Sequence, residues 1–181
     1  QFGGAFTTSF GNLAVDGTVE HKRAVYYKSA FLMNWIAAIM CAGFMAVVQD
    51  FIYLVFGPNF VIGIASVSVL VINTMIYLLD IPVISIQNAL GLHRLDAKWM
   101  VVQAVTAIGL GYIGGLYWGM TGIFMGLLIP LIVFTFIRKG IVICKNALGM
   151  SPSEYLLFII KECSKISISI ALTMWVCSYV K

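Results

Sequence analysis

Charged side chains are scarce in this sequence, and their scarcity excludes most soluble folds. Of the 181 residues, 10% are charged and 61% are hydrophobic, and the mean hydropathy is +1.01. Soluble domains carry about 25% charged residues and about 45–50% apolar ones. A chain of this length cannot bury so much apolar surface in a core of its own. We infer that the excess faces lipid.

Residues that mark enzymes and metal sites are also few. The two histidines, His21 and His93, lie among basic residues, and the four cysteines show no Cys-x-x-Cys spacing. The sequence has no Gly-x-Ser-x-Gly turn, no P-loop, no His-Glu-x-x-His motif and no paired carboxylates. Its basic segments carry no nucleic-acid-binding signature. We therefore expect no enzyme activity, no cofactor, no metal site and no nucleic-acid partner.

Long apolar runs dominate the sequence instead. A membrane-spanning helix needs about 20 apolar residues to cross a hydrocarbon core about 30 Å thick. We therefore expect an all-α, polytopic transmembrane helix bundle. Because the chain starts at Gln1 and ends in an apolar run, we also expect a fragment of a longer protein. The expected spans are 29–48, 61–88, 99–118, 121–137 and 166–181, and residues 1–14 are expected to end an earlier helix.

The basic residues follow the alternation of these spans. Ten of the 11 Lys and Arg residues fall in the connections 15–28, 91–98 and 138–165, whereas 49–60 and 118–120 have none. Five spans place the three basic connections on one side of the membrane. Cytoplasmic connections are enriched in Lys and Arg. The pattern therefore predicts a multi-pass protein with these three connections in the cytoplasm.

A stripe of polar residues marks the second span. Ser66, Asn73, Asp80 and Gln87 recur every seven residues, so they share one helical face. Polar groups that face lipid are costly, so the stripe should face other helices or a water-filled cavity. An acid inside a membrane span is a functional candidate. The alternatives for Asp80 are solvation at the cytoplasmic end, or pairing with a basic residue outside this chain.

Three further features refine these expectations. For Asn73, Gln87 and Gln103, the alternative to a role in a cavity is hydrogen bonding between helices. Pro82 removes one backbone hydrogen bond two residues after Asp80, so we expect a hinge there. The sequence Ser151-Pro152-Ser153-Glu154 is a capping box, and it predicts a helix start.

Glycines are spaced for close helix packing in the third and fourth spans. Gly111 and Gly115 form one small-xxx-small pair, and Gly122 and Gly126 form another. Such pairs let two helices approach closely. With a turn at Trp118-Gly119 between them, they predict a tight helical hairpin.

Several segments, taken in order, resemble the family of flippases for polysaccharide biosynthesis, which moves O-antigen or capsule repeat units. The likeness covers almost the whole chain. The segments that carry it are Thr8–Ala14, Phe31–Ile36, Phe51–Phe60, Asn88–Leu92, Tyr117–Gly126 and Ser151–Tyr155.

This resemblance implies a fold and an activity. The family belongs to the MOP superfamily, with the drug antiporters called MATE and the lipid II flippases. Its members have twelve to fourteen transmembrane helices in two pseudo-symmetric lobes. They move undecaprenyl-diphosphate-linked oligosaccharide across the bacterial inner membrane by alternating access. The resemblance therefore implies that residues 1–181 form part of a C-terminal lobe, with the lipid bilayer, the lipid-linked oligosaccharide and a missing N-terminal lobe as partners.

In such a transporter, Asp80, Asn73, Gln87 and Gln103 are the expected cavity residues, and Asp80 is a candidate for coupling to H⁺ or Na⁺. The family's cavity is commonly cationic. No Lys or Arg lies well inside an expected span, so we expect that positive charge to come from the N-terminal lobe. Three alternatives stay open: a MATE-like antiporter, a membrane-embedded glycan-modifying enzyme that uses His93 and Asp96, and a membrane scaffold.

Overall fold

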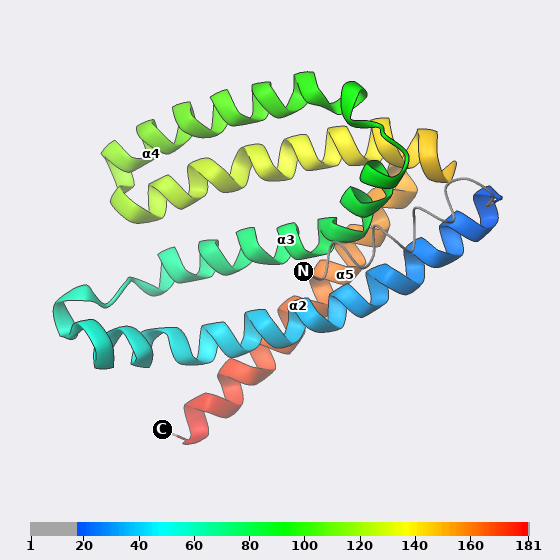
Figure 1. Ribbon diagram of the computed structural model, residues 1–181. Helices are drawn as coiled ribbons and strands as arrows, with labels where there is room; N and C mark the ends of the chain where they lie inside the picture. Colours follow the sequence, from blue (N-terminus) through cyan, green and yellow to red (C-terminus); the bar gives the residue numbers. More distant parts are fainter. Residues whose placement is uncertain (1–17, 181) are drawn as a thin grey trace.

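The computed structural model describes residues 18–180, and every element among them is helical (Figure 1). The all-α prediction is therefore confirmed for these residues. The expected helix end at 1–14 lies outside them, as do the side chains at 93, 95, 96, 136, 137, 141–143, 146 and 177–180. The elements are α2 (Val19–Phe56), η1 (Pro58–Phe60), α3 (Ile64–Ala89), α4 (His93–Thr135), η2 (Phe136–Leu148) and α5 (Pro152–Val180).

The helix α2 is longer than the span 29–48 that it contains. It begins where the Thr18 hydroxyl accepts a hydrogen bond from the His21 amide at 3.3 Å, and it ends at Gly57 with φ of 90°. The segments at either end, expected as connections, continue the helix instead. They are rich in residues that favour helix, and no proline interrupts them before Pro58.

The chain then folds back and forth through α3 and α4. Gly91, with φ of 64°, turns it from α3 into α4, and Gly119, with φ of 56°, reverses it inside α4. The two passes of α4 therefore carry the expected spans 99–118 and 121–137. Figure 1 shows both passes as a hairpin beside α3.

Three of the described helical segments are long and apolar enough to cross a membrane: Val19–Phe56, Ile64–Ala89 and Ala97–Gly140. The third contains the reversal at Gly119. The helix α5, which carries the expected span 166–181 up to residue 180, is not among them.

The expected polar connection 138–165 is helical over most of its length. After α4 the helix continues as η2, whose wide π-type turns end at Gly149 in the left-handed conformation. The helix α5 then starts at Pro152, and its Glu154 amide donates to the Ser151 hydroxyl at 3.2 Å. The capping box therefore begins a helix as predicted.

The core divides into two apolar clusters along the bundle. The first contains Tyr26, Val83 and Tyr155, and the second contains Ala37, Leu79 and Ile166. Each of the helices α2, α3 and α5 passes through both clusters. Polar residues separate the clusters on all three helices: Asn34 on α2, Asp80 on α3 and Glu162 on α5, each at most 8% exposed.

Candidate functional site

The polar stripe of α3 faces the returning pass of α4. The Ser66 and Thr121 hydroxyls lie 2.7 Å apart, and the Asn73 amide donates to the Phe124 carbonyl at 3.3 Å. Near the end of α3 that leads into α4, Asp80 and Gln87 contact Lys139 of η2. All four stripe residues therefore bond to one continuous stretch of helix. Their seven-residue spacing, which places them on one face of α3, makes this possible.

Asp80 forms an ion pair with Lys139 in the protein interior. The Lys139 Nζ lies 3.7 Å from Asp80 Oδ2 and donates to Gln87 Oε1 at 3.1 Å. The side chains of Lys139 and Asp80 are only 3% and 8% exposed. Two acceptors that lie two turns apart on α3 thus hold one buried ammonium.

Tyr155 adds a hydrogen bond from α5. Its hydroxyl donates to Asp80 Oδ1 at 3.5 Å. Burial, and next the neighbouring Asp80 carboxylate, raise the pKa of Tyr155 well above its ordinary value. The phenol therefore stays protonated and remains a donor throughout the neutral range. Asp80 is in this way joined to both η2 and α5.

The structure places Arg138 and Lys139 inside the bundle, although the sequence assigned both to a cytoplasmic connection. Arg138 is 8% exposed and donates to Gln103 Oε1. Asp80 therefore has a basic partner inside this chain, which neither of the alternatives given for it anticipated. Arg138 and Lys139 also supply positive charge that was expected from another lobe. The cause is η2, which continues the helix past residue 137 and turns Lys139 toward α3 and Arg138 toward Gln103 of α4.

These residues surround a cavity of about 470 Å³ between α3, both passes of α4 and the start of η2. Asp80, Arg138 and Lys139 give it a formal charge of +1, from one acid and two bases. Of the four expected cavity residues, Asn73, Asp80 and Gln103 line it, whereas Gln87 is buried beside it. The lining residues are Asn73, Tyr77, Asp80, Ile84, Met100, Gln103, Ala104, Ala107, Leu127, Leu131, Thr135, Arg138 and Lys139.

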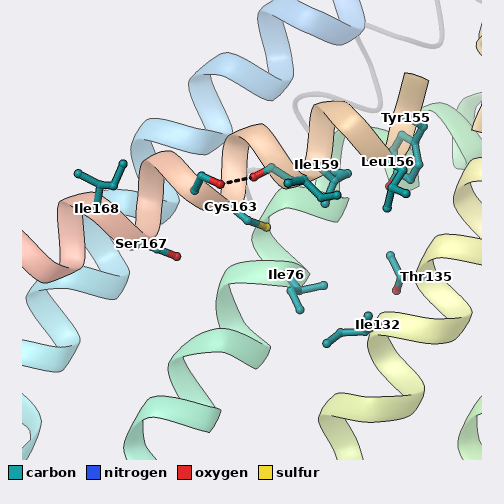
Figure 2. Close-up of a pocket in the computed structure, with 11 residues that line it drawn as sticks. Ile76, Ile132, Thr135, Tyr155, Leu156, Ile159, Cys163, Ser167 and Ile168 are labelled. Carbon is teal, nitrogen blue, oxygen red and sulfur yellow. Dashed lines mark hydrogen bonds between the residues drawn. The ribbon is translucent and has the colours of Figure 1, made fainter. Parts of the chain in front are cut away.

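A second cavity, of about 590 Å³, lies between α3, the returning pass of α4 and α5 (Figure 2). Its walls are mainly apolar, and Ile76, Ile132 and Leu156 come from the three helices in turn. Thr135 lines both cavities. A polar cavity and an apolar one therefore adjoin at a single residue of α4.

The α4 hairpin is packed through its glycines. A Cβ atom on Gly122 would overlap the Gly114 carbonyl oxygen, and a Cβ on Gly126 would overlap the Gly111 amide. A Cβ on Gly115 would lie 3.0 Å from the Ile123 side chain. The sequence motif named Gly111, Gly115, Gly122 and Gly126 but missed Gly114, which the hairpin pairs with Gly122.

Sequence analysis also missed a second buried acid. Glu162 is 5% exposed, and it accepts hydrogen bonds from Asn34 of α2 and, at 2.6 Å, from Lys165. It lies four residues before the expected span 166–181, so it was counted with a polar connection. The sequence feature that pointed to a buried polar partner was Asn34, which lies inside the expected first span.

The described side chains include no group of three or more His, Cys, Asp and Glu residues that could hold a metal ion. Compared with protein-family models, with curated proteins and with solved structures, the chain finds no match.

Proposed function

We propose that this chain is part of a transporter that flips lipid-linked oligosaccharide repeat units across the bacterial inner membrane by alternating access. The observation that carries the proposal is the pair of adjoining cavities that share Thr135. One has acidic, basic and amide side chains among its apolar walls, and the walls of the other are almost wholly apolar. A lipid-linked sugar diphosphate has the same two parts, a charged polar head and an apolar chain.

The polar cavity offers the groups that a sugar diphosphate needs. Arg138 and Lys139 are hydrogen-bond donors with positive charge, and guanidinium groups suit phosphate recognition. Asn73 and Gln103 supply amides, which can donate to and accept from sugar hydroxyls. In this proposal the head group enters the polar cavity while the lipid chain lies along the apolar one.

Coupling to H⁺ or Na⁺ belongs to the same proposal. Asp80 is held by Lys139 and Tyr155, on two other elements, so a change in its charge would alter contacts between three helical segments. A substrate phosphate that drew Lys139 away would have the same effect. Both events act on one ion pair, which is how coupling between a substrate and an ion would arise.

The test is complementation by the full-length protein in a bacterium that lacks its own surface-polysaccharide flippase. Surface glycan is scored for the wild type and for Arg138→Gln, and Lys145→Gln serves as the matched control because Lys145 is exposed on the same segment. Restored glycan with the wild type and the control, and its loss with inserted Arg138→Gln, would support the proposal.

A well-inserted wild type that restores no glycan, tested with several repeat-unit types, would count against flipping. Resistance to cationic drugs in the same cells would then favour the antiporter alternative. A single buried acid beside the cavity suits cation exchange, and this is the observation on which that alternative rests.

A further inference from the structure

A second polar cluster lies between α2 and α5, which run side by side in the same direction (Figure 1). Its centre is Glu162, which accepts from the Asn34 amide and from Lys165 Nζ at 2.6 Å. The Lys165 side chain is half exposed, whereas Glu162 is buried. The cluster therefore presents its basic group to the surroundings and keeps its acid inside.

The orientation of Asn34 leaves one oxygen without a donor. A carboxylate accepts and does not donate, so the NH₂ of Asn34 must face Glu162. The Asn34 Oδ1 therefore points elsewhere, and it is buried without a hydrogen-bond partner among the described residues. Since Asn34 is only 8% exposed, this oxygen is an unsatisfied acceptor inside the cluster, and its partial negative charge adds to the charge of Glu162.

Asn34 lines a cavity of about 250 Å³ that also contains the exposed side of Lys165. The aromatic rings of Phe31 and Trp35 meet edge to face, with centroids 6.3 Å apart, and both side chains are more than half exposed. The lining residues are Phe31, Asn34, Trp35, Ala38, Lys165, Ile166 and Ser169. The cavity thus combines an amide side chain, a cation, a hydroxyl and two aromatic rings.

The position of this cavity along the helices suits a lipid head group. Asn34 is five residues inside the span 29–48, about 8 Å from its start at about 1.5 Å per residue, and Lys165 directly precedes the span 166–181. Both positions fall at the cytoplasmic edge of the hydrocarbon core. Tryptophan and extended lysine side chains are typical of this depth.

We propose that this cavity binds the head group of a zwitterionic aminophospholipid, of the phosphatidylethanolamine type, from the cytoplasmic leaflet. The phosphate accepts from Lys165, which keeps two N–H groups beyond its bond to Glu162, and from the Ser169 hydroxyl. The ammonium group lies against the Trp35 ring. The negative charge of Glu162, directly behind Asn34, favours a cation at this end.

This inference goes beyond the flipping of a glycan. It requires that the chain lie in a membrane, and it holds equally for an antiporter or a scaffold. A failure of complementation would therefore leave it intact, and its own failure would leave the flippase proposal intact.

The test uses purified full-length protein, stripped of lipid in detergent and then given equimolar palmitoyl-oleoyl phosphatidylethanolamine and phosphatidylglycerol. Native mass spectrometry counts the lipids retained. We expect retention of the ethanolamine lipid to exceed that of the glycerol lipid by roughly two- to five-fold, which is the scale of a cation–π contact. Trp35→Leu, which lies outside the Glu162 cluster, should abolish that preference. Ser169→Val should lower the retention of both lipids, because both carry the phosphate.

Two matched controls separate this site from general lipid contact. Trp118→Leu removes an exposed Trp at the α4 turn, and Thr74→Val removes an exposed hydroxyl on α3. Both should retain lipid as the wild type does. Equal retention of the two lipids by the wild type, or its preference for the glycerol lipid, would overturn the proposal. So would wild-type preference in Trp35→Leu, or wild-type retention of both lipids by Ser169→Val.

Discussion

The Nζ of Lys139 lies 3.7 Å from Asp80 Oδ2, although 59 residues separate the two in the sequence, and neither side chain is more than 8% exposed. Each charge is therefore held in the bundle by the other. Removing one partner of a buried pair strands the remaining charge, which typically costs about 3–5 kcal/mol.

This relationship predicts an asymmetry between single and double variants. Lys139→Met should lower the stability of the purified protein by about 3–5 kcal/mol, because Asp80 loses its counter-charge. The double variant with Asp80→Asn should recover most of that loss, since no charge is then left unpaired. Thermal unfolding in detergent measures both. If the double variant loses as much stability as the Lys139→Met and Asp80→Asn single variants together, the two charges are not coupled.

The same acid gives a prediction about transport. If Asp80 couples ion movement to flipping, Asp80→Asn should lower glycan export and remove its dependence on external pH, because the amide cannot change charge. Export is measured in the complementation strain between pH 6 and 8. Full export by Asp80→Asn at every pH would reject the coupling role, while leaving the cavity itself in place.

The α4 hairpin predicts a graded series of glycine variants. Gly122→Ala and Gly126→Ala place a methyl group against the backbone of the opposite pass, so each should cost about 1–3 kcal/mol or more. Gly109→Ala is the matched control, because no atom lies within 4 Å of its added Cβ. It should leave the melting temperature unchanged or raise it, since alanine favours helix. A control that destabilises as much would contradict the packing described for the hairpin.

Cys144 is predicted to resist thiol reagents. Burial, and next the Asp80 carboxylate, raise its pKa to about 12, although Lys139 acts in the opposite direction. Only the thiolate reacts, so maleimide labelling of the folded protein should stay negligible from pH 7 to 9. Because the folded pKa exceeds the unfolded one, stability from the neutral thiol is lost only as the pH rises from 9 toward 12.

The control for this prediction is the neighbouring position. Lys145 is exposed, so Lys145→Cys in a Cys144→Ala background should label within minutes at pH 8. Mass spectrometry of peptides from the folded and the denatured protein gives the extent of labelling. Rapid reaction of Cys144 in the folded protein would show that η2 opens to solvent.

The sequence predicted the parts that depend on periodicity along one helix. The spacing of Ser66, Asn73, Asp80 and Gln87 placed them on one face, and their contacts with α4 and η2 agree. The capping box likewise depends on residues four positions apart at most. In each case, local backbone geometry fixes the relation between the residues.

Relations between helices could not be predicted in the same way. The sequence indicates that 121–137 is apolar, but not that the helix continues through η2 and brings Lys139 to Asp80. Pairing of Gly114 with Gly122 depends on how the hairpin crosses, which the motif does not specify. The partner of Glu162 depends on the register of α5 against α2, and that register is set by packing.

The polar layer between the two apolar clusters has a mechanical consequence. Asn34, Asp80 and Glu162 each lie between the two clusters along α2, α3 and α5, and α3 lacks a backbone hydrogen bond beside Asp80, because Pro82 has no N–H. A bend at this level would stretch a few polar contacts and leave both clusters whole. A bend of α3 at Pro82 would therefore act first on the Asp80–Lys139 ion pair, before either apolar cluster is disturbed.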